Sequence, residues 1–240
     1  MYITEPNKGK NREINTSYGR FARYPVTTPV IVKGDDMAEI LRKNLRGRVE
    51  KEDIIFLSEK SVACAQGRAI PLEDIHPGKL AVTLSHFVHK SPHGIGLSMP
   101  ETMEVTLREC GRTRILLAAA VSAVGRLFGR NGWFYLAAGK KAAAVDGPCP
   151  YTIPPYNRYV VPAPLHPNEE CRRLSSTLGC QVAIVDINDL GGKVLGVSSK
   201  KMNRKMIVQA LRDNPLGQED EHTPAGILRA LKKNCLYEND

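Results

Sequence analysis

Two aspartates and an asparagine follow an apolar run in the second half of the chain. Residues 182–185 are Val-Ala-Ile-Val, and Asp186, Asn188 and Asp189 come soon after them, before two glycines. Mg²⁺ and Mn²⁺ take carboxylate and amide oxygens as ligands, together with water and phosphate oxygens. The segment therefore predicts a divalent-metal site. A plain hairpin turn is the alternative, because Asn, Asp and Gly dominate turns for backbone reasons alone.

Further carboxylates stand in two other predicted turns. Residues 217–221 read Gly-Gln-Glu-Asp-Glu and precede a predicted helix, where acidic side chains also suit the helix dipole. Asp146 lies in a Val-Asp-Gly-Pro segment that is equally typical of an ordinary turn. Both segments are candidates for metal ligation, each with a purely structural alternative.

Two segments have side chains or backbone groups suited to a phosphate. Ser58-Glu59-Lys60-Ser61 follows a predicted buried strand at 53–58, and ligands bind at such strand ends in open α/β sheets. An exposed loop is the alternative there. Gly34-Asp35-Asp36 opens a predicted helix whose N–H groups suit an anion, although the two aspartates favour simple capping.

Several familiar catalytic motifs are missing from the sequence. It has no H-E-x-x-H pair, no G-x-S-x-G elbow, no Rossmann glycine fingerprint and no Walker sequence. These absences argue against a zinc hydrolase, a serine hydrolase of that type and the common nucleotide-binding folds.

Hydrophobic periodicity predicts the elements that position these turns. The order of strands and helices is mixed, without a regular βαβ rhythm, which favours an α+β fold of mixed sheets packed with helices. We expect extended segments at 25–32, 53–58, 133–136, 158–161, 181–186 and 194–197, and helices at 34–45, 77–93, 101–110, 114–128, 167–179, 202–212 and 225–232. The helix at 114–128 is apolar nearly all round and is expected to be buried.

The expected organisation is a polar N-terminal arm at 1–24 followed by a main domain at 25–240. That domain is either single or made of two closely associated subdomains with a boundary near 130–160. With 240 residues, 42% of them hydrophobic, the chain is long enough for a packed core.

Charge and hydropathy narrow the classes of partner. The net charge of +9 favours anionic partners, but the Lys and Arg residues are dispersed, so nucleic acid is not expected. The chain has no run of eighteen apolar residues and no apolar segment near its start. We therefore expect a cytoplasmic protein with no membrane span.

Six segments together resemble the gamma-glutamyl ligase family of coenzyme F-420. In order they are Val32-Lys33-Gly34-Asp35-Asp36-Met37-Ala38-Glu39-Ile40, Asp53-Ile54-Ile55-Phe56-Leu57-Ser58-Glu59-Lys60, Ala65-Gln66-Gly67-Arg68, Val160-Val161-Pro162, 182–191 and 217–224. The similarity runs nearly end to end and has the features of a divergent branch. It implies a homodimer with the family's mixed α/β fold.

The resemblance also implies an activity: glutamate or a similar amino acid is joined to a carboxylate through an acyl phosphate. The implied substrates are GTP, with ATP as the other option, an amino acid and a carboxylate acceptor, and the implied cation is Mg²⁺ or Mn²⁺. Mapped by position, the implied nucleotide-binding residues are Lys33, Gly34, Ser58, Glu59, Lys60 and Gly217. The implied metal ligands are Asp146, Asp186, Asp189 and Gln218.

One departure from the family supports a second reading. The family has a Ser-Lys pair where this chain has Ala63-Cys64, just before Ala65-Gln66-Gly67-Arg68. Loss of a phosphate-binding lysine predicts either substitution by Lys60 or loss of GTP binding. The alternative function is accordingly a non-catalytic homologue that binds a nucleotide or metabolite without ligase activity.

Overall fold

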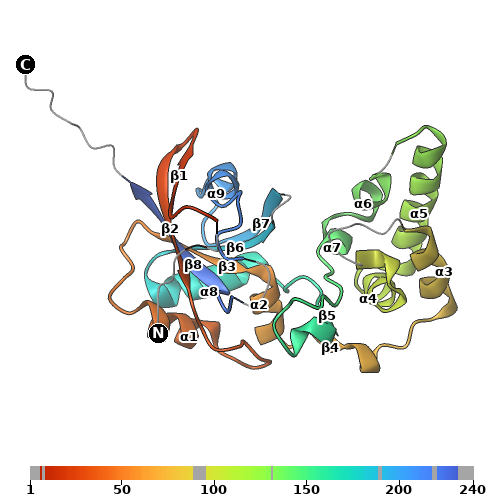
Figure 1. The fold of residues 1–240 in the computed structure, drawn as a ribbon, viewed down its shortest axis with the longest axis horizontal. Helices are drawn as coiled ribbons and strands as arrows, with labels where there is room; N and C mark the ends of the chain where they lie inside the picture. Colours follow the sequence, from red (N-terminus) through yellow and green to blue (C-terminus); the bar gives the residue numbers. More distant parts are fainter. Residues whose placement is uncertain are drawn as a thin grey trace, which may run out of the picture. The chain divides into compact units, whose positions relative to one another are not determined.

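The chain folds into two compact units. The computed structural model describes residue 6 and residues 9–88, 96–130, 132–188, 191–217 and 221–231. Unit 1 comprises residues 1–65 and 165–240, and unit 2 comprises residues 66–164 (Figure 1). Unit 2 is thus inserted into the sequence of unit 1. The expected boundary near 130–160 differs from this arrangement, in which the chain passes between units at 65/66 and again at 164/165.

Unit 1 is built on a six-stranded mixed sheet. Its strands run in the order β1-β2-β8-β3-β6-β7, with β3 and β6 parallel and every other pair antiparallel. The strands are β1 (Glu13–Thr16), β2 (Gly19–Val26), β3 (Ile54–Ser58), β6 (Gln181–Asn188), β7 (Gly191–Val197) and β8 (Ala225–Leu231). This mixed sheet with packed helices confirms the α+β prediction.

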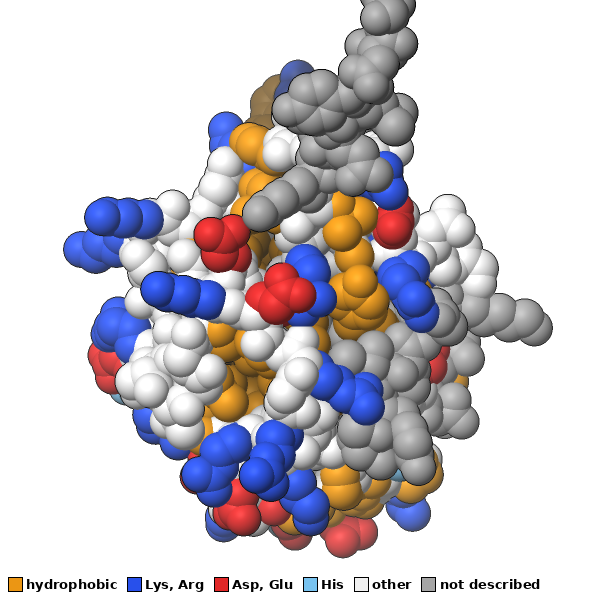
Figure 2. All heavy atoms as spheres, turned by 90° about the vertical axis from the view of Figure 1, so that its left-hand side faces the viewer, with side chains coloured by type: hydrophobic (Ala, Val, Ile, Leu, Met, Phe, Trp, Pro, Cys, Tyr) orange, Lys and Arg blue, Asp and Glu red, His pale blue; other side chains and the backbone are white. Residues whose placement is uncertain are grey.

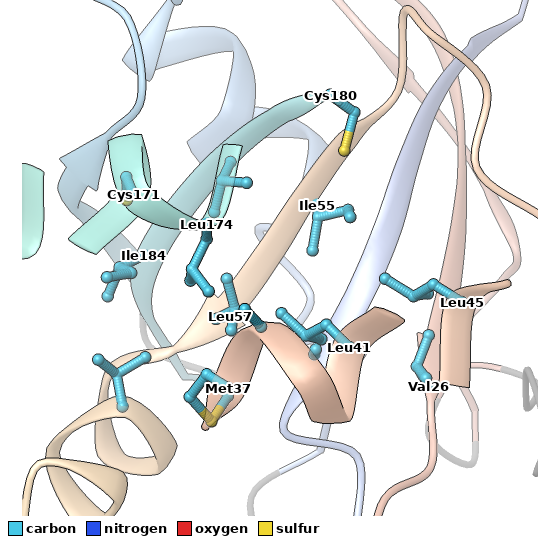
Figure 3. Packing of buried hydrophobic residues seen from close by; sticks show 14 of the residues in the cluster. Val26, Met37, Leu41, Leu45, Ile55, Leu57, Cys171, Leu174, Cys180 and Ile184 are labelled. Atoms are coloured by element: carbon cyan, nitrogen blue, oxygen red, sulfur yellow. The ribbon is translucent and has the colours of Figure 1, made fainter. Parts of the chain in front are cut away.

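Helices cover both faces of the sheet, which explains the continuous apolar runs of its central strands. On one face, Ile55 and Leu57 of β3 join a core with α1 (Met37–Leu45) and α8 (Pro167–Leu178) (Figure 3). On the other face, Phe56 packs in a second core with α9 (Arg204–Ala210). Strands buried on both faces read as hydrophobic runs rather than as alternating patterns.

Capping residues fix the ends of these helices as the sequence predicts. The Asp36 carboxylate accepts a hydrogen bond of 2.9 Å from the Ala38 N–H at the start of α1. Helix α8 begins with Pro167, and Gly179 ends it in the left-handed conformation at φ 73°.

Unit 2 consists mainly of helices. They are α3 (Lys79–Phe87), α4 (Pro100–Cys110), α5 (Arg112–Leu127), α6 (Trp133–Ala138) and α7 (Lys140–Ala143). The strands β4 (Ile70–Pro71) and β5 (Tyr159–Val160) form a second, two-stranded sheet. Short 3-10 helices lie at Leu72–Asp74, Gly96–Ser98 and Tyr156–Arg158. The predicted helices at 101–110 and 114–128 are confirmed here as α4 and α5.

Two predicted elements have the wrong type. Residues 133–136 belong to the helix α6, because Phe134 and Ala138, four positions apart, are both buried in the core of unit 2. Residues 225–231 form strand β8 rather than a helix, because they pair with β2 on one side and β3 on the other. In both cases tertiary contacts override local propensity.

The predictions for the N-terminal arm and for the burial of 114–128 are also corrected. Residues 13–16 and 19–26 are strands of the main sheet, and Phe21, Ala22 and Arg23 are buried. Most side chains of this segment are polar, so its sequence pattern did not indicate the few residues that face the core. Helix α5 is buried only at Ile115, Ala118 and Gly125, and most of its other apolar side chains are exposed.

No helix within the described ranges is both long enough and apolar enough to cross a lipid bilayer.

The tightest cross-strand packing in the main sheet provides a test of the fold. Gly226 of β8 lies directly opposite Phe56 of β3, and a Cβ atom at Gly226 would lie 2.5 Å from the Phe56 ring. We therefore predict that Gly226→Ala lowers the free energy of unfolding by about 1 to 3 kcal/mol, because the ring has no room to move. Denaturant unfolding measures the change.

The matched control is the same substitution in a Phe56→Leu background, where the overlapping ring atoms are gone. Gly226→Ala should cost clearly less there. An equal cost in both backgrounds would contradict the packing described for β3 and β8.

Candidate functional site

The polarity of the strands brings four separate segments to one edge of the main sheet. Val26, the last residue of β2, pairs with Ala225, the first residue of β8. Ala225 also pairs with Leu57 near the end of β3, and Ser58 pairs with Val185 of the parallel strand β6. The carboxyl ends of β2, β3 and β6 and the amino end of β8 therefore share one edge, which we call the carboxyl edge.

Ser58-Glu59-Lys60 leads from β3 into a helix at this edge, not into an exposed loop. Helix α2 (Glu59–Ala65) begins directly after the strand, and Glu59 is buried. The Ser58 N–H donates to the Pro224 carbonyl over 2.9 Å, and the Ser61 hydroxyl donates to the Ser58 carbonyl over 2.8 Å. These bonds hold Ser58 and the half-buried Lys60 against the segment before β8.

The Lys33-Gly34 turn is tied to the other end of α2. Gly34 has a φ of 90°, which favours glycine, and its N–H donates to the Ala65 carbonyl over 2.9 Å. The Asp35 carboxylate accepts from the Val32 N–H over 2.8 Å and closes the turn. Lys33 is exposed beside it.

Asp36 serves as a helix cap, in agreement with the simpler of its two predicted roles. The hydrogen bond from the Ala38 N–H, followed by the interaction with Arg173, lowers the pKa of the Asp36 carboxyl. The Arg173 guanidinium on α8 lies 3.1 Å from that carboxylate. The cap and the ion pair together fix where α1 begins and where the turn before it lies.

The segment before β8 contributes Gly217 to the same edge. Gly217 has a φ of 78°, a conformation that favours glycine, and the Glu221 carboxylate lies where a Cβ atom at this position would be. The His222 carbonyl accepts from the Thr28 N–H over 3.0 Å, which ties this segment to the one after β2. Gln218 lies outside the described residues.

Asp186 is the carboxylate that β6 places at the edge. It comes one residue after Val185, the partner of Ser58, and it is half-buried. Ile184 packs in the core with Val62 of α2, so strand alternation directs Asp186 to that same face. Its cross-strand neighbour is Lys193 of β7. The hairpin predicted here is confirmed, whereas Asp189 in its turn lies outside the described residues.

Asp146 belongs to unit 2. Its backbone forms a bridge with Val161, with two hydrogen bonds of 2.9 Å each. Because Asp186 belongs to unit 1, their joint ligation of one metal ion stays a prediction.

The donor types at the carboxyl edge suit a hard divalent cation, and Asp186 supplies a carboxylate from a strand that is otherwise apolar. Within the residues that the structure describes, no group of three His, Cys, Asp or Glu side chains is placed to hold a metal ion. A complete set of ligands would therefore need residues such as Asp189 or Gln218.

Cys64 occupies the position where the resemblance predicts a lysine. It lies in α2 with 2% of its surface exposed, and the preceding Ala63 is fully buried. Lys60, one helical turn earlier, is therefore the ammonium group that α2 offers at this edge.

Figure 2 shows one face of the molecule, on which Lys and Arg side chains are spread among acidic and uncharged residues.

Sequence reasoning did not identify some residues that shape the edge. The carbonyl groups of Pro224 and His222 accept the hydrogen bonds that join its segments, and the Thr223 hydroxyl donates to the Leu216 carbonyl over 2.5 Å. Arg173 lies 137 positions from Asp36, the residue that it fixes. Backbone acceptors and long-range ion pairs leave no local sequence signal.

Comparison with known proteins agrees with the resemblance. The profile of the family described as F420-0:gamma-glutamyl ligase matches residues 25–203. The coenzyme F420:L-glutamate ligase of Methanopyrus kandleri is 28% identical over 232 residues, which covers 83% of this chain and 82% of the relative. The enzyme of the same name from Methanosarcina barkeri is 40% identical over 57 residues, 24% of this chain and 22% of that protein.

The matched range includes β3, α2 and β6 together with the turn after β2, and so most of the segments that meet at the carboxyl edge. The chain therefore belongs to the F420-0:gamma-glutamyl ligase family.

Proposed function

We propose that this chain is a ligase that depends on a nucleotide and a divalent metal ion and forms an amide bond between a carboxylate and an amino acid of the glutamate type. The observation that carries the proposal is the meeting of the end of β3 at Ser58, the end of β6 at Asp186 and the segment before β8 at one edge of the sheet. Membership of a ligase family indicates an enzyme that acts on small molecules.

The proposed chemistry has two steps. The terminal phosphoryl group of GTP, or of ATP, moves to an oxygen of the acceptor carboxylate, which gives an acyl phosphate and a nucleoside diphosphate. The amine nitrogen then attacks the acyl carbon, the amide bond forms, and inorganic phosphate leaves while the amine loses a proton. Such reactions depend mainly on positioning and on charge stabilisation around the phosphoryl group.

The residues at the carboxyl edge suit that task. The ammonium groups of Lys60 and Lys33 offset the negative charge of phosphate oxygens, and the Ser58 hydroxyl can donate to one of them. Gly34, where no atom lies within 4 Å of a Cβ position, allows a ligand to approach the backbone closely. Bound Mg²⁺ or Mn²⁺ would stabilise the charge of the transferring group, with Asp186 and, as predicted from the resemblance, Asp146, Asp189 and Gln218 as its ligands.

The second candidate function is ligand binding without turnover. The observation that favours it is Cys64, a buried thiol at the position where the resemblance implies a phosphate-binding lysine. Coenzyme F420-0, glutamate, GTP and Mn²⁺ serve as the probe mixture for turnover. Release of phosphate that requires both the acceptor and the amine supports the ligase. Nucleotide binding with no release supports the binding protein.

The assembly implied by the resemblance, a homodimer, is part of the proposal and does not depend on which of the two functions holds.

The role of Lys60 can be tested by calorimetry with GTP and Mn²⁺. We predict that Lys60→Ala weakens nucleotide binding about 10- to 100-fold, since a charge-assisted hydrogen bond contributes about 1.5 to 3 kcal/mol. The control is Lys51→Ala, because Lys51 is exposed in the same unit before β3 begins, at the opposite end of the strand. Equal effects of the two substitutions would argue against a phosphate site at Lys60.

Asp186 can be tested through metal binding alone. Asp186→Asn keeps the size of the side chain but removes its charge, and we expect the affinity for Mn²⁺ to fall at least about tenfold. Electron paramagnetic resonance of free Mn²⁺ measures the affinity without any substrate. Glu52→Gln, at the opposite end of the sheet, should leave it unchanged. Unaltered Mn²⁺ binding by Asp186→Asn would remove Asp186 from the proposed ligands.

A further inference from the structure

Helix α5 carries an unusual amount of exposed apolar surface. Leu117 and Leu127 are 68% and 85% exposed, and Phe128, directly after the helix, is 73% exposed. We define the α5 face by the large apolar side chains that are exposed on this helix and at its end: Leu116, Leu117, Val121, Val124, Leu127 and Phe128. Apolar side chains grouped in this way mark interaction sites, whereas single exposed ones need no explanation.

The α5 face is a continuous strip along one side of the helix. Successive residues of an α-helix are rotated by about 100° around its axis, so the six side chains of the face fall within an arc of about 140°. Ile115 and Ala118 lie on the opposite side and are buried in the core of unit 2. The geometry is that of a helix whose outer, apolar side can enter a lipid surface while its inner side holds it to the protein.

Arginines flank this strip on both sides. By the same rotation, Arg112 and Arg126 lie beyond one border of the apolar arc and Arg114 lies beyond the other, and all three are exposed. Arg126 donates to the carbonyl of Phe87, whose side chain is 65% exposed, so this guanidinium group is held beside apolar surface. Long basic side chains at such a border keep their charge at the level of lipid phosphates while their apolar neighbours enter the acyl region.

The charge around the α5 face has a single sign. Residues 110–145, which include α5, α6 and α7, contain no Asp or Glu and six basic residues: Arg112, Arg114, Arg126, Arg130, Lys140 and Lys141. A second copy of this chain on the same face would bring arginines against arginines, which opposes such a contact. An anionic bilayer complements the surface, because it offers hydrocarbon bordered by negatively charged head groups.

Helix α6 extends the surface with side chains typical of a membrane interface. Leu136 and Tyr135 are 81% and 43% exposed, and the ring of Trp133 lies against Gly125 of α5. Trp and Tyr are enriched where hydrocarbon meets water. We propose that the α5 face, together with α6, docks unit 2 on the surface of a bilayer that contains anionic lipids.

The test is co-sedimentation of the full chain with vesicles, which is independent of the ligase chemistry because it needs neither nucleotide nor metal ion. The chain should bind vesicles of equimolar phosphatidylcholine and phosphatidylglycerol at least about tenfold more tightly than vesicles of phosphatidylcholine alone. Leu117→Ser and Leu127→Ser should each weaken that binding at least about tenfold, because each removes apolar surface from the acyl region. Both positions are exposed, so the fold should be kept, which circular dichroism checks.

Matched controls lie in unit 1. Leu165→Ser changes an exposed leucine, 49% accessible, outside the α5 face and should leave vesicle binding unchanged. Replacing Arg112 and Arg130 together by Gln should reduce the preference for anionic vesicles at least about tenfold. Arg172→Gln, at an exposed arginine of α8, should leave this preference unchanged.

The single tryptophan of the chain gives a second readout that needs no substitution. Brominated lipid chains in the bound vesicles should quench the fluorescence of Trp133, because α6 lies beside α5. The proposal is overturned if the chain does not bind anionic vesicles, if both leucine variants bind as tightly as the wild type, or if vesicles bind without quenching. Absence of vesicle binding together with a lower solution mass of Leu127→Ser would assign the face to a second copy and equally overturn it.

Discussion

Strand β3 is the element on which the rest of the structure depends. It is hydrogen-bonded on both sides, to β8 and to β6, and Ile55, Phe56 and Leu57 are buried with 0 to 1% of their surface exposed. A strand buried in this way has one allowed register, since a shift by one residue would exchange its two core faces. The position of β3 therefore fixes where β6 and β8 end, and so where their turns lie.

The chemistry proposed for the chain follows from that constraint. Because β6 is parallel to β3 and β8 is antiparallel to it, Asp186 and the Gly217 segment arrive at the edge where β3 continues into α2. The Ser58 N–H donates to the Pro224 carbonyl and joins the end of β3 to the segment before β8, and the Gly34 N–H donates to the Ala65 carbonyl and joins the turn before α1 to the end of α2. The site is thus a consequence of sheet topology, and few of its residues are adjacent in sequence.

Local sequence patterns predicted those elements whose packing agrees with their propensity. The strands β3 and β6 and the helices α1 and α8 have apolar runs or capping residues such as Asp36 and Gly179, and the structure confirms them. Strand β8 and helix α6 were predicted wrongly because long-range pairing and burial decided their conformations. The sequence also did not predict the exposure of α5, because an apolar helix has the same sequence pattern whether its side chains are buried or exposed.

The candidate site was predictable to a similar extent. Sequence and resemblance singled out Ser58 and Asp186, which lie at the same edge of the sheet, but not the backbone acceptors that join the segments there. A crystal structure with Mn²⁺ and a non-hydrolysable GTP analogue is the most direct test of the account. It should show an anomalous Mn²⁺ peak beside Asp186 and the phosphate groups near Lys60 and Gly34. A nucleotide and metal ion bound away from the ends of β3 and β6 would contradict it.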